Sequence, residues 1–122
     1  MIILLVEDCQ FHRGLISHIL IREGHALLIA ETGEQGIEML EHHVVDYVLT
    51  DKDMHVLDGF AVIIAANKLK PTPKIWLMSN VLKDGDTKRA LEFGAHKVVD
   101  KDHLLRELKQ AGLIQRSGQV KT

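Results

Sequence analysis

The chain has 122 residues, of which 46% are hydrophobic and 26% charged, a composition typical of one soluble globular domain. A formal net charge of −2 and a pI near 6.4 give no polycationic surface, so direct binding to nucleic acid is not expected. Cys9 is the only cysteine, which excludes an intrachain disulfide. The sequence shows neither a basic leader nor an apolar run of ~20 residues, so we expect a cytoplasmic protein without membrane insertion.

Short apolar runs alternate along the chain with segments whose hydrophobic residues recur at helical spacing. This alternation predicts strands and helices in turn. The predicted strands cover residues 2–6, 26–30, 45–49, 75–78 and 98–99. The predicted helices cover residues 10–22, 36–42, 58–69, 84–93 and 103–110, with Asp102 as the cap of the last. We expect residues 1–112 to form the domain and residues 113–122 to form a mobile tail.

Five strand–helix units in succession predict an α/β fold. Connections between parallel strands are right-handed and place helices on both faces of the sheet. At this size the usual solution is the flavodoxin-like, doubly wound (βα)5 arrangement, a parallel five-stranded sheet in the order 2-1-3-4-5. In that order the first and third strands are neighbours at the switch point, where ligands bind beyond the carboxyl ends of the strands.

Acidic, hydroxyl and basic side chains follow four of the predicted strands. Glu7 and Asp8 follow the first, Asp51 the third, Ser79 the fourth and Lys101 the fifth. The predicted strand order brings these residues to one edge, where three carboxylates repel one another unless a cation lies among them. Oxygen ligands of this kind suit Mg²⁺. A hydroxyl and an ammonium group beside the cation are suitable partners for phosphoryl oxygens.

The same residues resemble the pattern of receiver domains of two-component response regulators, including the single-domain chemotaxis type. The resemblance covers residues 2–111 and rests on Glu7-Asp8, Asp51, Asp58-Gly59, Ser79, and Gly94-Ala95 leading to Lys101. It implies that Asp51 accepts phosphate from a histidine kinase or a phosphotransfer protein. Signalling would then follow by protein contact or by onward phosphotransfer. The resemblance therefore implies a phosphorelay switch that phosphorylates and dephosphorylates itself, and not a turnover enzyme.

The resemblance also implies a role for each site residue. Glu7, Asp8 and Asp51 would hold Mg²⁺ or Mn²⁺, with the backbone carbonyl of Asp53 as a further ligand. Ser79 and Lys101 would bind the phosphoryl group. Ser79 would move toward that group, the loop of residues 80–83 would follow, and the face formed by the fourth helix, fifth strand and fifth helix would change for an output protein.

Several positions depart from the family pattern. His55 replaces a common Pro, Val56 a frequent Gly and Asn80 a small residue beside the serine. These changes alter the stiffness of the loops and access to the site, but not its charges. Val98 occupies a position where many receivers carry a switching Tyr or Phe, so an aromatic readout is not expected. Asp102 replaces the Pro that follows the lysine.

Residues beside these motifs have simpler interpretations. We expect Lys52 to face solvent and Cys9 to be a small buried residue. The spacing of the eight histidines matches no zinc site, so we expect these side chains to lie on the solvated surface.

Two other functions remain open. Asp51-Lys52-Asp53 and Ser79-Asn80 are similar to motifs of haloacid-dehalogenase-type phosphatases, which also form an aspartyl phosphate. That family usually has its acidic motif after the first strand, with Thr or Val at the position filled here by His55. The second alternative is a receiver fold that acts only as an unphosphorylated interaction module.

Overall fold

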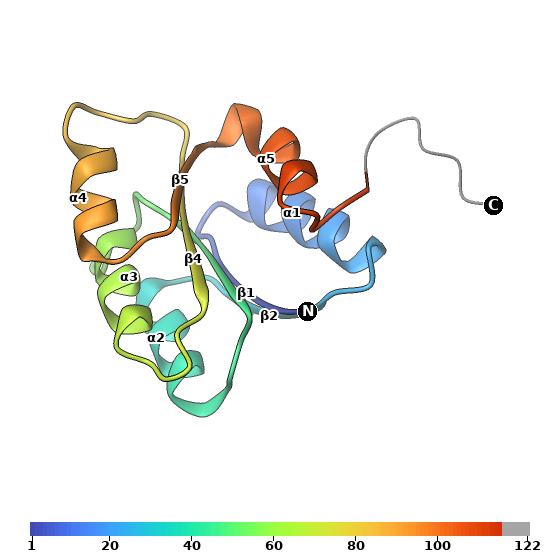
Figure 1. Cartoon of the computed structure of the whole chain (residues 1–122), viewed down its shortest axis with the longest axis horizontal. Coiled ribbons are helices and arrows are strands. Elements are labelled where there is room, and N and C mark those ends of the chain that lie inside the picture. Colours follow the sequence, from blue (N-terminus) through green and yellow to red (C-terminus); the bar gives the residue numbers. More distant parts are fainter. Residues whose placement is uncertain (116–122) are drawn as a thin grey trace.

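Strands and helices alternate along the computed structural model, which describes residues 1–115 (Figure 1). The strands are β1 (Ile2–Val6), β2 (Ala26–Ala30), β3 (Tyr47–Asp51), β4 (Lys74–Ser79) and β5 (Lys97–Asp100). The helices are α1 (Gln10–Arg22), α2 (Gly33–His42), α3 (Gly59–Asn67), α4 (Asp86–Phe93) and α5 (Leu104–Gln110), with a 3-10 turn at Lys101–His103 before α5. None of these helices is long and apolar enough to cross a bilayer.

The five strands form one parallel sheet in the order β2-β1-β3-β4-β5, which confirms the predicted fold. The carboxyl ends of β1, β3, β4 and β5 lie at the same edge. In the register of the sheet, Val6 pairs with Thr50 and Asp51 pairs with Met78. Ser79 pairs with Asp100. The strand order therefore places the residues that follow β1 and β5 on either side of the end of β3.

Helices cover both faces of the sheet, with α1 and α5 on one side and α2, α3 and α4 on the other (Figure 1). Alternate residues of β1 show the division. Leu4 and Val6 pack in the cluster under α2, α3 and α4, whereas Ile3 and Leu5 pack in the cluster under α1 and α5. A strand that is buried on both faces needs apolar residues throughout, which is why β1 and β4 are almost continuous apolar runs.

Local contacts fix where two helices begin. The Thr32 hydroxyl accepts a hydrogen bond from the Gln35 backbone N–H, so α2 begins three residues earlier than predicted. Asp58 caps α3 in the same way through the backbone N–H of Ala61. Position 59 must be glycine because a Cβ there would collide with the backbone carbonyl of Asp51. Gly59 thus lets α3 start directly against the end of β3.

The third strand differs from its prediction. β3 begins at Tyr47 instead of residue 45 and ends at Asp51 instead of residue 49. Asp51 is held in the ladder by its register with Met78 of β4, so it is the last strand residue and not part of the following loop. The candidate acceptor therefore sits on the rigid end of a central strand.

The carboxyl-terminal part of the domain differs from the sequence prediction at two points, the cap of α5 and the end of the packed core. Asp102 does not cap α5; instead the Asp100 side chain accepts a hydrogen bond from the Asp102 backbone N–H and begins the 3-10 turn. The domain also extends past residue 112, because Leu113 and Ile114 are 3% and 8% exposed and pack against the α1 and α5 core. Residues 116–122, the rest of the expected tail, lie outside the described residues.

Val56 is a strained point in the loop between β3 and α3. Its φ of +67° is in the left-handed region, and its side chain is 88% exposed and makes little compensating contact. The left-handed conformation costs a residue with a Cβ about 1–2 kcal/mol. We expect Val56→Gly to raise the free energy of unfolding by about 1 kcal/mol, measured by urea denaturation.

Val44→Gly is the matched control, because Val44 is 70% exposed and has no positive φ. This substitution is expected to lower stability by about 0.5–1 kcal/mol, since glycine gains entropy in the unfolded chain. A Val56→Gly protein that is no more stable than the wild type would contradict the strain at this position.

Candidate functional site

The candidate site lies at the carboxyl edge of the sheet. Glu7 and Asp8 follow β1, Asp51 ends β3, Ser79 ends β4 and Lys101 follows β5. The structure brings the three carboxylates and the lysine into contact distance, as the strand order requires. The serine lies at the same edge but bonds elsewhere. The roles of these residues in phosphorylation stay predictions.

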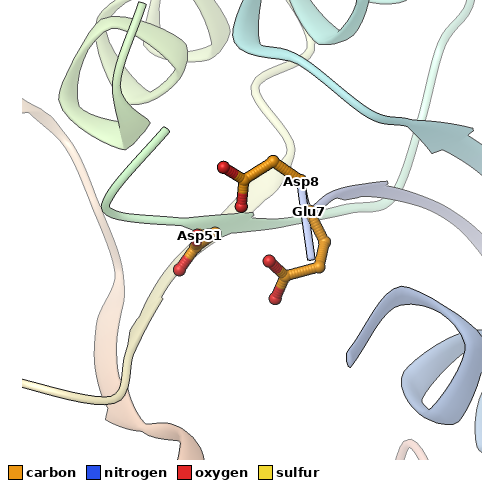
Figure 2. A group of neighbouring side chains, drawn as sticks. All are labelled: Glu7, Asp8 and Asp51. Carbon is orange, nitrogen blue, oxygen red and sulfur yellow. The ribbon is translucent and has the colours of Figure 1, made fainter. Parts of the chain in front are cut away.

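Three carboxylates form the centre of the site (Figure 2). One oxygen from each of Glu7, Asp8 and Asp51 lies within 4.8 Å of the others, and the described residues contain no other such group of potential metal ligands. Glu7 is fully buried, Asp51 is 6% exposed and Asp8 is exposed. Such a set of hard oxygen donors, open to solvent on the Asp8 side, fits a divalent cation such as Mg²⁺.

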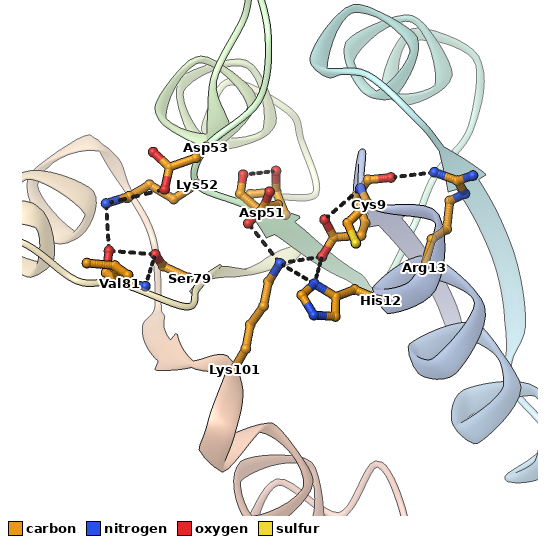
Figure 3. A network of polar contacts seen from close by, with 11 residues as sticks. Cys9, His12, Arg13, Asp51, Lys52, Asp53, Ser79, Val81 and Lys101 are labelled. Atoms are coloured by element: carbon orange, nitrogen blue, oxygen red, sulfur yellow. Dashed lines mark hydrogen bonds and ion pairs between the residues drawn. The ribbon is translucent and has the colours of Figure 1, made fainter.

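Lys101 bridges two of these carboxylates (Figure 3). Its ammonium nitrogen lies 2.5 Å from Glu7 Oε1 and 3.0 Å from Asp51 Oδ1. The other oxygen of Glu7, Oε2, accepts a hydrogen bond of 3.2 Å from the Cys9 backbone N–H. Glu7 is therefore buried with both of its oxygens in contact with donors, as a buried charge requires.

Electrostatics make Asp51 unusual among carboxylates. Burial raises the pKa of Asp51 from 3.8 to about 7; the charge of Glu7 acts in the same direction, and Lys101 opposes both. Burial alone would lower the pKa of Lys101, but its hydrogen bond to Glu7 and the charge of Asp51 outweigh burial and raise it. Lys101 thus stays charged, and a further cation would favour ionised Asp51.

Ser79 is fully buried, and its hydroxyl bonds to Val81 of the loop after β4 and not to Asp51. Its hydroxyl donates to the Val81 carbonyl at 2.8 Å and accepts from the Val81 N–H at 3.1 Å. Figure 3 shows this pair beside Lys52, apart from the group around Lys101. The hydroxyl must therefore exchange a partner in the loop before it can bond to a group on Asp51.

Two residues of α1 belong to the site although no sequence motif marked them as candidates. His12 Nδ1 lies 3.3 Å from the Lys101 ammonium nitrogen and 3.9 Å from Glu7 Oε1. Arg13 donates to the backbone carbonyls of Glu7 at 3.1 Å and Asp8 at 3.3 Å, which holds the loop after β1 in place. The only sequence signal was their position in the first turn of the helix that follows the acidic pair.

Two expectations for residues that flank the site are wrong. Lys52 does not face solvent: it is 3% exposed, and its ammonium nitrogen lies 2.7 Å from Asp86 Oδ2 and 2.9 Å from the Val81 carbonyl. The long lysine side chain reaches across to the loop that follows β4. Cys9 is exposed and not buried, because it lies just before α1, outside the packed faces of the sheet.

The raised pKa of Asp51 predicts how stability depends on pH without metal. Protonated Asp51 favours the folded state, and this contribution is complete below about pH 4 and lost as the pH rises through about 7. We expect Asp51→Asn, which stays neutral, to stabilise the metal-free protein at about pH 8 by on the order of 1–3 kcal/mol, and by much less at about pH 5. Urea denaturation in EDTA at the two pH values measures the difference.

Asp102→Asn, which removes an exposed carboxylate from the turn before α5, is the control for the change in net charge. A gain from Asp51→Asn that is the same at both pH values would show that Asp51 is ionised throughout.

Comparison with known proteins gives a family for the chain. The sequence model of the response regulator receiver domain matches residues 3–112. Gliding motility regulatory protein of Myxococcus xanthus is 30% identical over 107 residues, which cover 84% of this chain and 13% of that protein. The sensor histidine kinase CheAY of Helicobacter pylori is 32% identical over 107 residues, with the same two coverages. The chain therefore spans only about an eighth of the length of either relative, 13% in both cases.

Solved structures show the same fold. Chemotaxis protein CheY4 of Vibrio cholerae superposes with a TM-score of 0.81 at 21% identity, covering 89% of this chain and 96% of that one. A CheY-like receiver domain protein of Methanospirillum hungatei gives 0.82 at 24% identity, covering 90% and 91%. The receiver domain of the sensor histidine kinase PA1611 of Pseudomonas aeruginosa gives 0.76 at 24% identity, covering 89% and 94%, and holds a magnesium ion in its active-site cleft.

The family model spans nearly all of the described residues, and the sheet order and the acidic edge agree with it. The resemblance inferred from the sequence is thereby confirmed, and the chain belongs to the response regulator receiver domain family.

Proposed function

We propose that the chain is a phospho-accepting switch of a two-component phosphorelay, which takes phosphate onto Asp51 from a histidine kinase or a histidine phosphotransfer protein in the cytoplasm. The observation that carries the proposal is the position of Asp51. Its carboxylate ends a central strand, contacts the ammonium of Lys101 at 3.0 Å and shares a cluster of oxygens with Glu7 and Asp8. Membership of the receiver family supports the proposal.

The transfer step needs an ionised, fixed carboxylate. An oxygen of Asp51 attacks the phosphorus of a phosphohistidine, the phosphorus–nitrogen bond breaks, and the imidazole leaves with the bonding pair and takes up a proton. Charge builds on the phosphoryl oxygens during this step, so catalysis depends on position and on positive charge nearby. Lys101 supplies that charge from the β5 side of Asp51, where Glu7 also holds its ammonium.

The acidic cluster fits the metal that the family implies. Glu7, Asp8 and Asp51 each present an oxygen within 4.8 Å of the others, and the Asp53 backbone carbonyl is the further ligand we expect. Bound Mg²⁺ supplies positive charge for the phosphoryl oxygens and screens the repulsion between the three carboxylates. The magnesium ion in the cleft of the PA1611 receiver domain supports this assignment.

The switch itself depends on the loop between β4 and α4. Phosphorylation replaces one carboxylate charge by up to about −2. The Ser79 hydroxyl then donates to a phosphoryl oxygen instead of the Val81 carbonyl, the loop of residues 80–83 follows, and the face of α4, β5 and α5 changes for an output protein. Val98 of β5 packs half-buried against the core, so the loop carries the signal without an aromatic side chain at this position.

The structure favours this function over a phosphatase of the haloacid-dehalogenase type. In such a phosphatase the side chain of the second aspartate must point at the substrate, where it acts as general acid and base. Here the Asp53 side chain is 74% exposed and lies 3.6 Å from the ammonium of Lys52. The remaining alternative is an interaction module that is never phosphorylated. Modification of Asp51 by acetyl phosphate would exclude it.

Treatment with acetyl phosphate and Mg²⁺ tests the acceptor directly. We expect mass spectrometry to find a labile adduct on Asp51 that is absent from Asp51→Asn and from samples treated with EDTA. The adduct requires both the nucleophile and neutralised charge on the donor. Asp102→Asn serves as the control and should be modified like the wild type. Adduct formation in Asp51→Asn at the wild-type yield would refute the assignment.

Magnesium binding tests the acidic cluster. Even outer-sphere substitutions typically reduce metal affinity 10–100-fold, so we expect Asp8→Asn, which removes a ligand, to weaken Mg²⁺ binding about tenfold or more. Isothermal titration calorimetry measures the affinity. Asp84→Asn is the control, because it removes an exposed carboxylate from the loop before α4 and changes the net charge by the same amount. Equal affinities for the two variants would place the ion elsewhere.

A further inference from the structure

Lys52 carries a buried positive charge that has no role in the phosphotransfer proposed above. It follows Asp51 directly, yet its side chain belongs to a different group of contacts (Figure 3). The backbone of Lys52 is fixed on both sides, since its N–H donates to the Met78 carbonyl at 2.8 Å and its carbonyl accepts from the Gly59 N–H at 2.9 Å. The ammonium therefore reaches the loop after β4 from a rigid base.

The ammonium of Lys52 and the hydroxyl of Ser79 share one acceptor. The Val81 carbonyl accepts from Lys52 at 2.9 Å and from Ser79 at 2.8 Å. A carbonyl oxygen has two lone pairs, so both donors are held at once. When the serine hydroxyl leaves, the carbonyl keeps a charged donor and is not left without a partner.

Asp86, the first residue of α4, fixes the other side of this arrangement. Its Oδ2 lies 2.7 Å from the Lys52 ammonium nitrogen and accepts a hydrogen bond of 2.7 Å from the Lys83 backbone N–H. A buried lysine requires such a partner. The pair ties the start of α4 and the loop before it to the end of β3.

We propose that Lys52 is a positioning residue for Ser79: its ammonium stays bonded to the Val81 carbonyl as the loop adjusts, and remains its donor when the serine hydroxyl turns to the phosphoryl group on Asp51. This inference rests on the proposed phosphorylation of Asp51. Without the ammonium, Ser79 becomes the one side-chain donor to that carbonyl within the described residues, and its departure is opposed. Lys52 thus sets how readily Ser79 takes part in the reaction.

A double-mutant cycle tests this role. The readout is the initial rate at which the Asp51 adduct forms with acetyl phosphate and Mg²⁺. We expect Ser79→Ala to lower this rate about tenfold or more in the otherwise wild-type protein, because a donor to the phosphoryl oxygen is lost. In a Lys52→Met background the same substitution should lower it about threefold or less, because Ser79 is already withheld from the phosphoryl group.

Lys97→Met is the matched control background. It removes a lysine–carboxylate pair of 2.8 Å with Glu107, from the end of β5 away from the site, and should leave the full effect of Ser79→Ala. An equal effect of Ser79→Ala in the wild-type and Lys52→Met backgrounds would mean that Lys52 only stabilises the fold, and would overturn the inference while leaving the proposed function intact. A wild-type protein that forms no adduct would overturn both.

A measurement on the wild-type chain does not depend on how well the variants fold. The Val81 N–H donates to the Ser79 hydroxyl and the Lys83 N–H donates to Asp86. In ¹H–¹⁵N spectra with acetyl phosphate and Mg²⁺, the Val81 amide proton should shift upfield as Ser79 turns away. The Lys83 amide should shift much less, because it keeps its hydrogen bond to Asp86, which stays paired with Lys52. A shift of the Lys83 amide as large as that of Val81 would overturn the inference.

Discussion

The contact of one ammonium group with two carboxylates is the interaction on which the site depends. Glu7 is fully buried and Asp51 nearly so, and neither charge would be stable there without Lys101 between them. The lysine brings the end of β5 to the ends of β1 and β3, so it joins segments that are far apart in the sequence. The same contact leaves one side of the acidic cluster, around Asp8, open to solvent.

Much of this arrangement could be predicted from the sequence, for physical reasons. Continuous apolar runs at strand length indicated buried strands, and five strand–helix units in a chain of this size made the order 2-1-3-4-5 the expected one. Once that order was known, residues directly after a strand, such as Glu7 and Lys101, had to meet at one edge. Residue type then indicated the chemistry, because carboxylates, a hydroxyl and an ammonium suit few ligands other than a metal and a phosphoryl group.

What could not be predicted depended on the reach and direction of side chains. Lysine is a residue type usually found on the surface, and only the position of Asp86 in the folded chain gives the buried Lys52 ammonium its carboxylate partner. Ser79 was placed at the correct edge, but the sequence does not reveal that its hydroxyl bonds to Val81. The burial of Leu113 depends on contacts beyond the last helix, which no periodicity reports.

Gly59 makes the junction of β3 and α3 rigid, whereas the loop on the other side of Asp51, between β4 and α4, is held less tightly. No Cβ fits between this position and the Asp51 carbonyl, and the Gly59 N–H is bonded to the Lys52 carbonyl, so the end of β3 and the start of α3 form one stiff corner. The opposite loop, residues 80–85, is joined to that corner by the Lys52 side chain, which donates to the Val81 backbone carbonyl and to Asp86 at the start of α4. Under the proposed phosphorylation, a change at the Asp51 carboxylate would therefore leave the α3 side in place and act on the loop before α4.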